Sequence, residues 1–313
     1  MSTDEELPPA DVWSQWLLHG RHADDPRLRQ SVCVMVDRYI DRVLDGARLA
    51  PDETLADIGS GEGLVALRAI ERVGRSLRVW LTDVSEPMLR HAERQAIERG
   101  LQDQCRFLCC PADRLEGIGD ASVDVVTTRS VLAYVLDKTS ALREFHRVLK
   151  PGGRISLAEP VMQDDALAAR AMKTVIDSKP AEGVNPLMLL LHRWKAAQYP
   201  DTEEKIRLSP LANYAERDLI RFALSAGFVD LHLELHIDVI PSIVRTWDAF
   251  VNSSPHPLAP TLRAIMAEQF TPQERELFER SMRPVVEDPK AISTDRMVYL
   301  TARKPPAGPA GPP

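Results

Sequence analysis

The sequence predicts an α/β protein with a buried parallel sheet, and three observations support this fold class. Short apolar segments typical of strands alternate with amphipathic helical segments between residues 51 and 160. A glycine-rich loop, Gly59–Gly63, lies between the first of these strands and the helix that follows it. Further strand-like segments return near the end of the chain. Because alternating strands and helices form right-handed βαβ units, the strands are expected to pair in parallel.

The elements of the first half follow in order along the chain. Residues 11–50 are expected to be helical, because apolar residues recur at three- and four-residue spacing and make one stripe: Val32, Val36, Tyr39, Ile40, Val43 and Leu44. Strands are expected at 55–58, 78–82, 106–109, 123–128 and 154–158, and helices at 64–73, 86–99 and 140–149. Gly100 ends the second of these helices, and Lys150-Pro151-Gly152-Gly153 ends the third.

The pattern changes after residue 160. Residues 161–213 and 241–292 are helical without strand signals, whereas 216–226 is expected to be a helix and 229–240 and 296–302 strands. We therefore expect five parts: a helical lid segment at 1–50, a ligand-binding core at 51–160, a helical insertion at 161–215, the rest of the core at 216–303 with a second insertion at 241–293, and a disordered Pro/Gly-rich tail at 304–313. The two insertions are expected to form a cap over the ligand edge of the sheet, and residues 1–10 to be disordered.

Charge and composition argue against several classes of partner. The formal net charge is −7, and Lys and Arg form no long run. Because nucleic-acid binders carry a basic face, we expect no nucleic-acid partner. The acidic N-terminus lacks the basic and apolar regions of a secretory signal, and no apolar run approaches the ~18 residues of a membrane span. We expect a cytoplasmic protein without a membrane partner, and a homodimer is compatible with the sequence.

The four cysteines, Cys33, Cys105, Cys109 and Cys110, include no CxxC pair and no zinc-site spacing with histidine. We therefore expect these cysteines to be free thiols in a reducing compartment, and we expect no metal site. The alternative is a soft metalloid site at Cys109 and Cys110, but adjacent side chains of a strand point in opposite directions.

The strongest functional signal is the segment Leu55 to Gly63, in which a strand leads through glycines into a helix. Gly59, Gly61 and Gly63, with Ser60 between them, let a ligand lie against bare backbone at a helix N-terminus. Asp57 precedes the first glycine by two residues. A carboxylate there repels a pyrophosphate but suits an ammonium and a nearby sulfonium, which favours S-adenosylmethionine over a dinucleotide.

Two further carboxylates follow the second and third strands. Asp83 can accept both hydrogen bonds of a ribose diol, or it caps the next helix. Val84 follows it, and Met88 is expected to pack against an adenine ring. Ala112 and Asp113 follow the third strand, where a backbone N–H and a carboxylate can contact adenine, although a solvent-facing loop acid is the alternative.

Read in order, these residues resemble the class I S-adenosylmethionine-dependent methyltransferases. The matching motifs are LADIGSGEG (55–63), LTDVS (81–85), PADRL (111–115), VDVVTTRSVLAYV (123–135) and LKPGGRISLAEP (149–160). The resemblance implies a Rossmann-like, seven-stranded sheet whose last strand is antiparallel. It implies cofactor roles for Asp57, Gly59, Gly61, Asp83, Ala112 and Asp113, and places Arg129 near the methionine moiety. There Arg129 binds the cofactor carboxylate, a substrate anion or a neighbouring acid.

Methyl transfer is an in-line displacement that needs alignment and exclusion of water more than any single catalytic group. The candidates for catalysis are His192, His19 and Tyr134; packing roles are the alternative for the two histidines. Thr128-Arg129-Ser130-Val131 replaces the Asn/Asp-Pro-Pro-Tyr/Phe motif of amino-methylating DNA and protein-glutamine enzymes. We therefore expect methylation of O, N or C in a small organic molecule such as a secondary metabolite. The alternatives are a catalytically silent cofactor-binding regulator and a nucleotide-dependent oxidoreductase.

Overall fold

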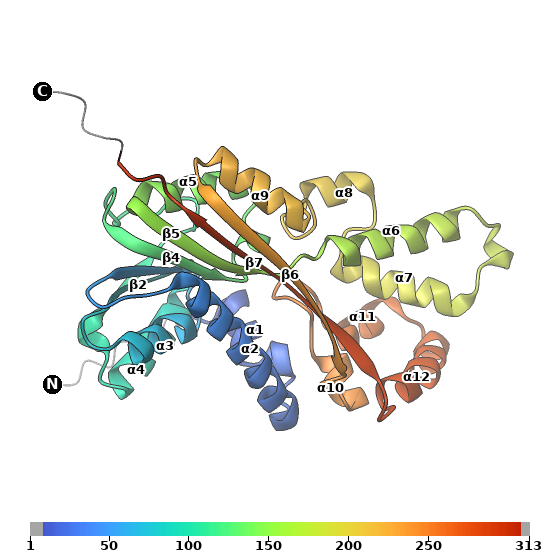
Figure 1. Ribbon diagram of the computed structural model, residues 1–313. Coiled ribbons are helices and arrows are strands. Elements are labelled where there is room, and N and C mark those ends of the chain that lie inside the picture. Colours follow the sequence, from blue (N-terminus) through green and yellow to red (C-terminus); the bar gives the residue numbers. More distant parts are fainter. Residues whose placement is uncertain (1–8, 308–313) are drawn as a thin grey trace, which may run out of the picture.

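A computed structural model describes residues 9–307, and these form an α/β structure around one sheet. Its strands are β1 (Thr54–Ile58), β2 (Arg78–Asp83), β3 (Cys105–Cys109), β4 (Val123–Arg129), β5 (Leu149–Glu159), β6 (Val229–Pro241) and β7 (Ile292–Arg303). In the described residues the strand order is β3-β2-β1-β4-β5-β7-β6. The strands from β3 to β5 pair in parallel, whereas β7 is antiparallel to both β5 and β6 (Figure 1). This confirms the expected seven-stranded sheet with an antiparallel last strand.

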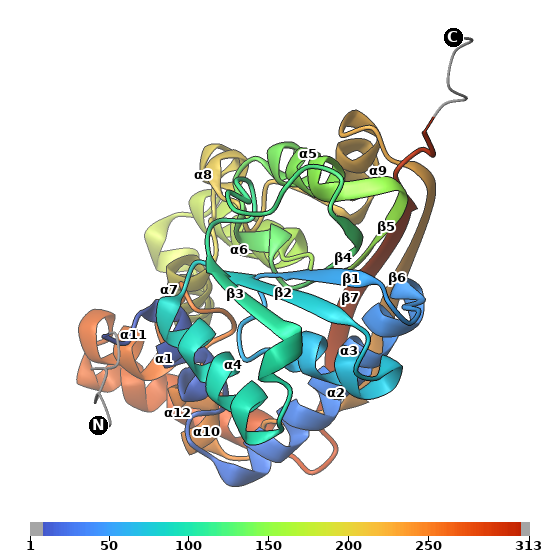
Figure 2. The same ribbon diagram turned by 90° about the vertical axis from the view of Figure 1, so that its left-hand side faces the viewer.

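Helices cover both faces of the sheet, as the end view shows (Figure 2). One face packs against α2 (Pro26–Ala47), α3 (Leu64–Val73) and α4 (Glu86–Glu98). The other packs against α5 (Lys138–Val148) and α9 (Glu216–Ser225). Because side chains alternate along a strand, neighbouring strand residues feed the two apolar clusters: Leu55 faces α2 and α3, whereas Ala56 faces α5.

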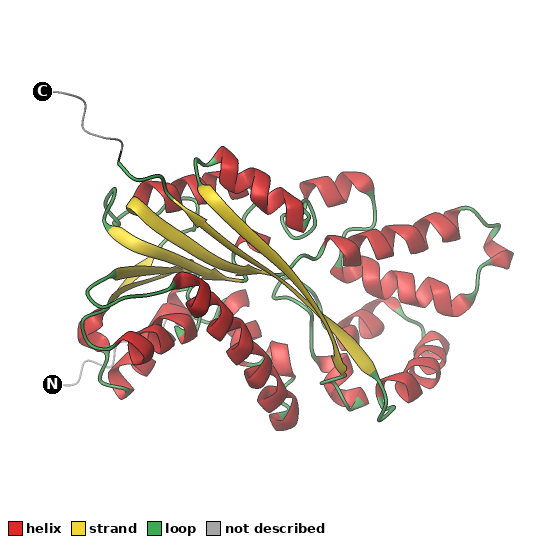
Figure 3. Cartoon of the chain, in the orientation of Figure 1, coloured by secondary structure: helices red, strands yellow, loops and turns green. Residues whose placement is uncertain are grey.

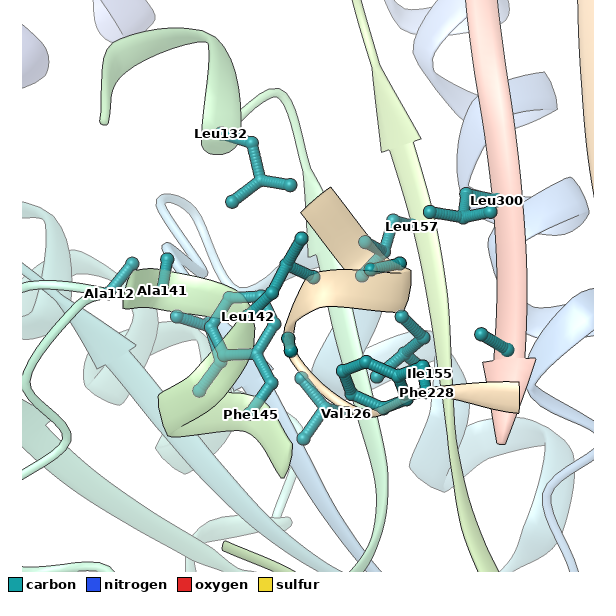
Figure 4. Packing of buried hydrophobic residues seen from close by; sticks show 14 of the residues in the cluster. Ala112, Val126, Leu132, Ala141, Leu142, Phe145, Ile155, Leu157, Phe228 and Leu300 are labelled. Carbon is teal, nitrogen blue, oxygen red and sulfur yellow. The ribbon is translucent and has the colours of Figure 1, made fainter. Parts of the chain in front are cut away.

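The cluster beneath α5 is drawn in Figure 4. Phe145 of α5 lies beside Val126 of β4 and Ile155 of β5, and both aliphatic side chains are fully buried. Phe228, which lies between α9 and β6, completes this cluster beside Ile155. This packing fixes the ends of β4 and β5, from which the loops of the candidate site begin.

The apolar stripe expected between residues 11 and 50 is confirmed. All six of its side chains lie on α2 and are buried. Asp25 caps this helix by accepting hydrogen bonds from the Arg27 and Leu28 N–H groups, at 2.8 and 3.0 Å, and Pro26 occupies its first turn. A short helix, α1 (Val12–Leu18), precedes it and begins at a capping box formed by Asp11 and Ser14.

The second half of the chain adds helices beyond the strand ends: α6 (Gln163–Asp177), α7 (Pro186–Gln198), α8 (Glu203–Leu208), α10 (Trp247–Asn252), α11 (Leu262–Gln269) and α12 (Pro272–Val286). Figure 3 shows these helices beside the long ribbon of β6 and β7. The helices α7, α10, α11 and α12 share an apolar cluster of their own, in which Phe278 is fully buried. Segments distant in sequence therefore pack together next to the carboxyl ends of the parallel strands.

One element begins earlier than the sequence indicates. The strand expected at 154–158 starts at Leu149, so the Lys150-Pro151-Gly152-Gly153 segment belongs to β5. The pairing between β4 and β5 shifts register between Val123 and Val125, and Gly152 has φ +79°. A bulge with a left-handed glycine thus lets the turn signal lie inside a strand.

The disorder expected at the two ends falls largely outside the described residues, which exclude 1–8 and 308–313. None of the helices in residues 9–307 combines the length and the apolarity needed to cross a membrane.

Candidate active site

The glycine loop lies at the carboxyl end of β1 and leads into α3. Gly59, Gly61 and Gly63 have φ values of +63°, +52° and +76°, a region that L side chains rarely adopt. The Ser60 N–H donates to the Thr82 carbonyl at 2.8 Å, which ties the loop to the end of β2. A Cβ atom at Gly61 would lie 3.5 Å from Leu17 of α1. The loop therefore presents bare backbone to the space beneath α1.

Asp83, at the end of β2, is buried beside this loop. Its two carboxylate oxygens accept hydrogen bonds from the Gly61 N–H at 2.8 Å and from the Ser85 N–H at 2.9 Å. Burial raises the pKa of Asp83, and the backbone hydrogen bonds oppose that rise. Each oxygen keeps acceptor capacity for a further donor.

Asp57 lies near the end of β1, and its side chain is buried in the protein interior. Its side chain is 1% exposed; one oxygen accepts from the Thr127 hydroxyl at 2.9 Å, and the other has no hydrogen-bond partner. Burial raises its pKa to about 7. The strand alternation explains this place: Asp57 shares the side of β1 with Leu55, toward the first turn of α3.

A cavity of about 750 Å³ runs from the glycine loop to the helices of the second half. Eight of the residues expected at the site line it: Gly59, Gly61, Asp83, Val84, Ala112, Asp113, Arg129 and Tyr134. The opposite end is lined by Tyr39 and Met35 of α2, Trp194 of α7, Phe250 of α10 and Leu262 of α11. The structure thus brings the carboxyl ends of β1, β2 and β4 and the helices beside them to one cavity.

Three other expected ligand contacts lie away from the cavity wall. Met88 is fully buried, because its position on α4 directs it into the protein interior instead of toward a ligand. Gly63 stands where a Cβ would lie 3.0 Å from Ala92 and 3.2 Å from Leu81, so it allows α3 to approach α4 and β2. Ser60 is buried, and its hydroxyl has no partner among the described residues.

The two histidines proposed for catalysis do not line the cavity either. His192 lies on α7 with its Nε2 3.2 Å from an Asp201 carboxylate oxygen. His19 is exposed after α1, with its Nδ1 3.1 Å from Asp24. Each ring is engaged by an acid of a neighbouring loop, and neither residue is among those that line the cavity.

Tyr134 does reach the cavity, from a 3₁₀ turn at Leu132–Tyr134. Burial raises the pKa of its hydroxyl, and the charge of Glu159 raises it further, so the phenolate is disfavoured at neutral pH. Its ring meets that of Trp13 edge-on, with centroids 4.9 Å apart. This geometry suits a wall or positioning role better than that of a base.

A fully buried acid at the end of β5, Glu159, organises the loop below this tyrosine. Its carboxylate accepts hydrogen bonds from the Thr128 hydroxyl at 2.6 Å and from the Val131 and Ala133 N–H groups at 2.9 and 3.3 Å. Burial raises its pKa. The loop that follows β4 is therefore held from beneath by a single side chain.

The short helix α1 closes the cavity over the glycine loop. The indole N–H of Trp16 donates to the Ser254 carbonyl at 3.0 Å, and Arg21 donates to Glu62 at 3.1 Å. These contacts join the N-terminal segment both to the loop after α10 and to the glycine loop itself. The cavity is thus covered by residues far apart in the sequence.

Sequence reasoning did not find several polar residues of the cavity wall. Tyr39 donates to Asp295 of β7 at 2.5 Å, and Lys195 and Gln198 reach the cavity from α7. The only local signal was the spacing of Trp194, Lys195 and Gln198 on one side of a helix. That spacing does not say what the helix faces, because its neighbours come from distant segments.

Comparisons with known proteins agree with this geometry. Residues 56–157 match the family model described as a methyltransferase domain. Nocamycin O-methyltransferase of Saccharothrix syringae is 34% identical over 203 residues, which cover 63% of this chain and 66% of that protein. The ubiquinone/menaquinone biosynthesis C-methyltransferase UbiE of Xanthomonas oryzae pv. oryzae is 31% identical over 188 residues, which cover 60% of this chain and 70% of that enzyme. The chain belongs to the class I S-adenosylmethionine-dependent methyltransferases.

Two further comparisons extend this result. The tRNA 5-carboxymethoxyuridine methyltransferase of Escherichia coli is 34% identical over 132 residues, which cover 42% of this methyltransferase and 48% of that enzyme. The crystal structure of the YcgJ protein from Bacillus subtilis has a TM-score of 0.53 at 16% identity and covers 86% of this chain and 99% of its own, which shows the shared fold. The methyl donor of this methyltransferase is S-adenosylmethionine.

The buried Asp57 predicts how the stability of this methyltransferase depends on pH. Its pKa is about 7 in the folded protein against 3.8 for an exposed aspartate. Between these values the folded state holds a proton that the unfolded state releases, so the free energy of unfolding falls as pH rises from about 4 to about 7. The upper bound of this contribution is roughly 4 kcal/mol.

The variant Asp57→Asn should therefore lose less stability than the wild type between pH 5 and pH 8, as measured by urea unfolding. Asp83 and Glu159, whose pKa values are also raised, act in the same direction in both proteins and cancel in the difference. The control is Asp103→Asn, at an exposed acid. An equal loss in wild type and Asp57→Asn would show that Asp57 does not titrate in this range.

Proposed function

We propose that the cofactor lies along the carboxyl ends of β1 to β4, with Asp83 accepting hydrogen bonds from its ribose hydroxyls. The fit rests on the wall of the cavity: Asp83 has spare acceptor capacity, and the loop from Gly59 to Gly61 carries no bulky side chain. Ala112 and Asp113 supply a backbone N–H and a carboxylate for the adenine end. When bound, the cofactor supplies an electrophilic methyl group on a sulfonium.

Arg129, at the end of β4, suits the cofactor carboxylate in this arrangement. It lines the cavity half-buried, and its guanidinium makes no hydrogen bond or ion pair with any residue in the range 9–307. Burial and the charge of Arg21 lower its pKa, whereas Glu62 and Asp57 oppose that shift. A carboxylate ligand would stabilise the charge of this guanidinium, which can bind it in a bidentate manner.

We further propose that the methyltransferase acts on a small organic molecule in the same cavity. The observation that carries this is the continuity of the cavity, which joins the cofactor end to an apolar chamber lined by Met35, Val244, Phe250 and Leu262. Helices α7, α10 and α11 contribute Trp194, Phe250 and Leu262 to the wall of that chamber. Apolar and aromatic side chains make up most of the wall at that end, as is typical of small-ligand sites, whereas a site for a nucleotide within a folded RNA is typically bordered by a basic surface.

Tyr134 would align the acceptor in this arrangement instead of removing its proton. Its position is fixed by the Trp13 ring and by the Glu159-held loop. Because methyl transfer depends on alignment and exclusion of water, closure of α1 over both ligands is the main contribution of this chain.

The test supplies the purified methyltransferase with radiolabelled S-adenosylmethionine and two sets of acceptors in separate reactions. One set is a panel of phenols and aromatic carboxylic acids, and the other is unmodified transfer RNA. We expect label in the solvent-extractable small molecules and none above background in the precipitated RNA. Label confined to the RNA would overturn the proposed acceptor class.

A further inference from the structure

Lys195 stands out among the cations that line the cavity. It lies on α7 on the same side as Trp194 and Gln198, and all three reach the cavity. Its ammonium lies 4.6 Å from the centroid of the Trp194 ring and 5.6 Å from that of Tyr199. This ammonium makes no hydrogen bond or ion pair with the residues that the structure describes. A half-buried ammonium therefore faces the cavity with aromatic neighbours alone.

The other cations of the cavity wall are engaged or lie at the cofactor end. Arg21 donates to Glu62 at 3.1 Å, and Arg296 donates to Asp164 and, at 3.0 Å, to Asp165. Arg129 is the second cation whose side chain has no partner among the described residues, but the acidic charges that act on it come from Glu62 and Asp57, in and before the glycine loop. Lys195 is thus the unpaired cation of the acceptor end.

The acid whose charge reaches Lys195 is Asp165, which already accepts the hydrogen bond from Arg296. Burial lowers the pKa of Lys195, which marks an ammonium that has lost water without gaining a direct acidic partner. Such a group is costly to bury alone, and an anion delivered by a ligand would offset the cost.

On the basis of the proposed function, we propose that the methyl acceptor carries an anionic oxygen group, a carboxylate or an ionised enol or phenol, that binds the Lys195 ammonium. The apolar part of the acceptor lies against Trp194, Phe250 and Leu262, which line the same end of the cavity. Lys195 therefore determines which acceptors are taken and acts as a positioning residue.

The test uses two probes of equal shape, naphthalene-2-carboxylate and naphthalene-2-carboxamide, titrated into the protein saturated with S-adenosylhomocysteine. Binding is followed by calorimetry and by tryptophan fluorescence, because Trp13, Trp16 and Trp194 line the cavity. We expect the wild type to bind the carboxylate at least about tenfold more tightly than the amide, as a charge-assisted contact would give. Lys195→Met should remove this preference and leave the affinity for the amide within about twofold.

Two variants keep the test interpretable. Lys195→Arg retains the charge and should retain the preference for the carboxylate. Lys173→Met removes a charge on α6 that pairs with Asp177 away from the cavity, and this control should also retain the preference. An unchanged preference in Lys195→Met, or no preference in the wild type, would overturn the inference. Failure of the wild type to bind S-adenosylhomocysteine would instead refute the proposed cofactor site, so the two failures are distinguishable.

Discussion

Replacing Asp83 with alanine is expected to weaken the binding of S-adenosylhomocysteine by about 100-fold or more. The carboxylate is placed to accept hydrogen bonds from the ribose, and bonds to a charged acceptor contribute about 1.5–3 kcal/mol each. Its loss also leaves the Gly61 and Ser85 N–H groups, at 2.8 and 2.9 Å from its oxygens, without their partner. The substitution therefore removes the carboxylate that we expect to bind the ribose and also removes a hydrogen bond that ties the glycine loop to the end of β2.

Calorimetric titration of the variant measures this loss, and thermal unfolding shows whether the fold persists. Asp83→Asn should fall between wild type and Asp83→Ala, because its amide oxygen can still accept from one backbone N–H. Asp103→Ala, at an exposed position in the turn before β3, is the control and should bind as the wild type does. Wild-type affinity in Asp83→Ala would place the ribose elsewhere.

The sequence predicted those parts of the site that belong to short contiguous motifs at strand ends. Gly59, Gly61, Asp83 and Ala112 each lie at or just after the end of a parallel strand, and the carboxyl ends of such strands meet at one edge. The order of the strands along the chain therefore sufficed to bring these residues together.

Side-chain direction was harder to predict than residue position. Asp57 and Met88 stand in the expected elements, yet each points into the protein, because alternation along β1 and the helical period of α4 turn them away from the ligand edge. A shift of one residue reverses the side that a strand residue faces, and sequence boundaries are not that sharp.

The acceptor end depends on contacts that no local pattern encodes. Lys195, Tyr39 and Phe250 come from three helices that are far apart in the chain and meet only through tertiary packing. His192 on α7 is an example: the sequence predicted a helix here, but it did not predict that this histidine contacts Asp201 of the following loop. Which side of α7 meets the cavity is set by α10 and α11.

Replacing Gly59 with alanine is expected to have the largest effect on stability at this site. Gly59 has φ +63°, and an added Cβ would overlap the Cγ2 methyl of Val131 and lie 3.1 Å from its Cγ1. The left-handed backbone costs an L residue about 1–2 kcal/mol, and overpacking typically adds about 1–3 kcal/mol. Val131 cannot retreat easily, because its N–H donates to the buried Glu159 at 2.9 Å.

The two causes can be separated by matched variants measured by urea unfolding. Gly100→Ala carries the backbone strain alone, since Gly100 has φ +66° and nothing within 4 Å of an added Cβ. Val131→Ala in the Gly59→Ala background removes the overlapping methyl groups and should recover the overpacking part but not the strain. The double-mutant cycle should therefore show a favourable coupling of about 1 kcal/mol or more. Additive losses, or equal losses in Gly59→Ala and Gly100→Ala, would mean that the loop after β4 yields to the new side chain, and the rigidity inferred from Glu159 would then be wrong.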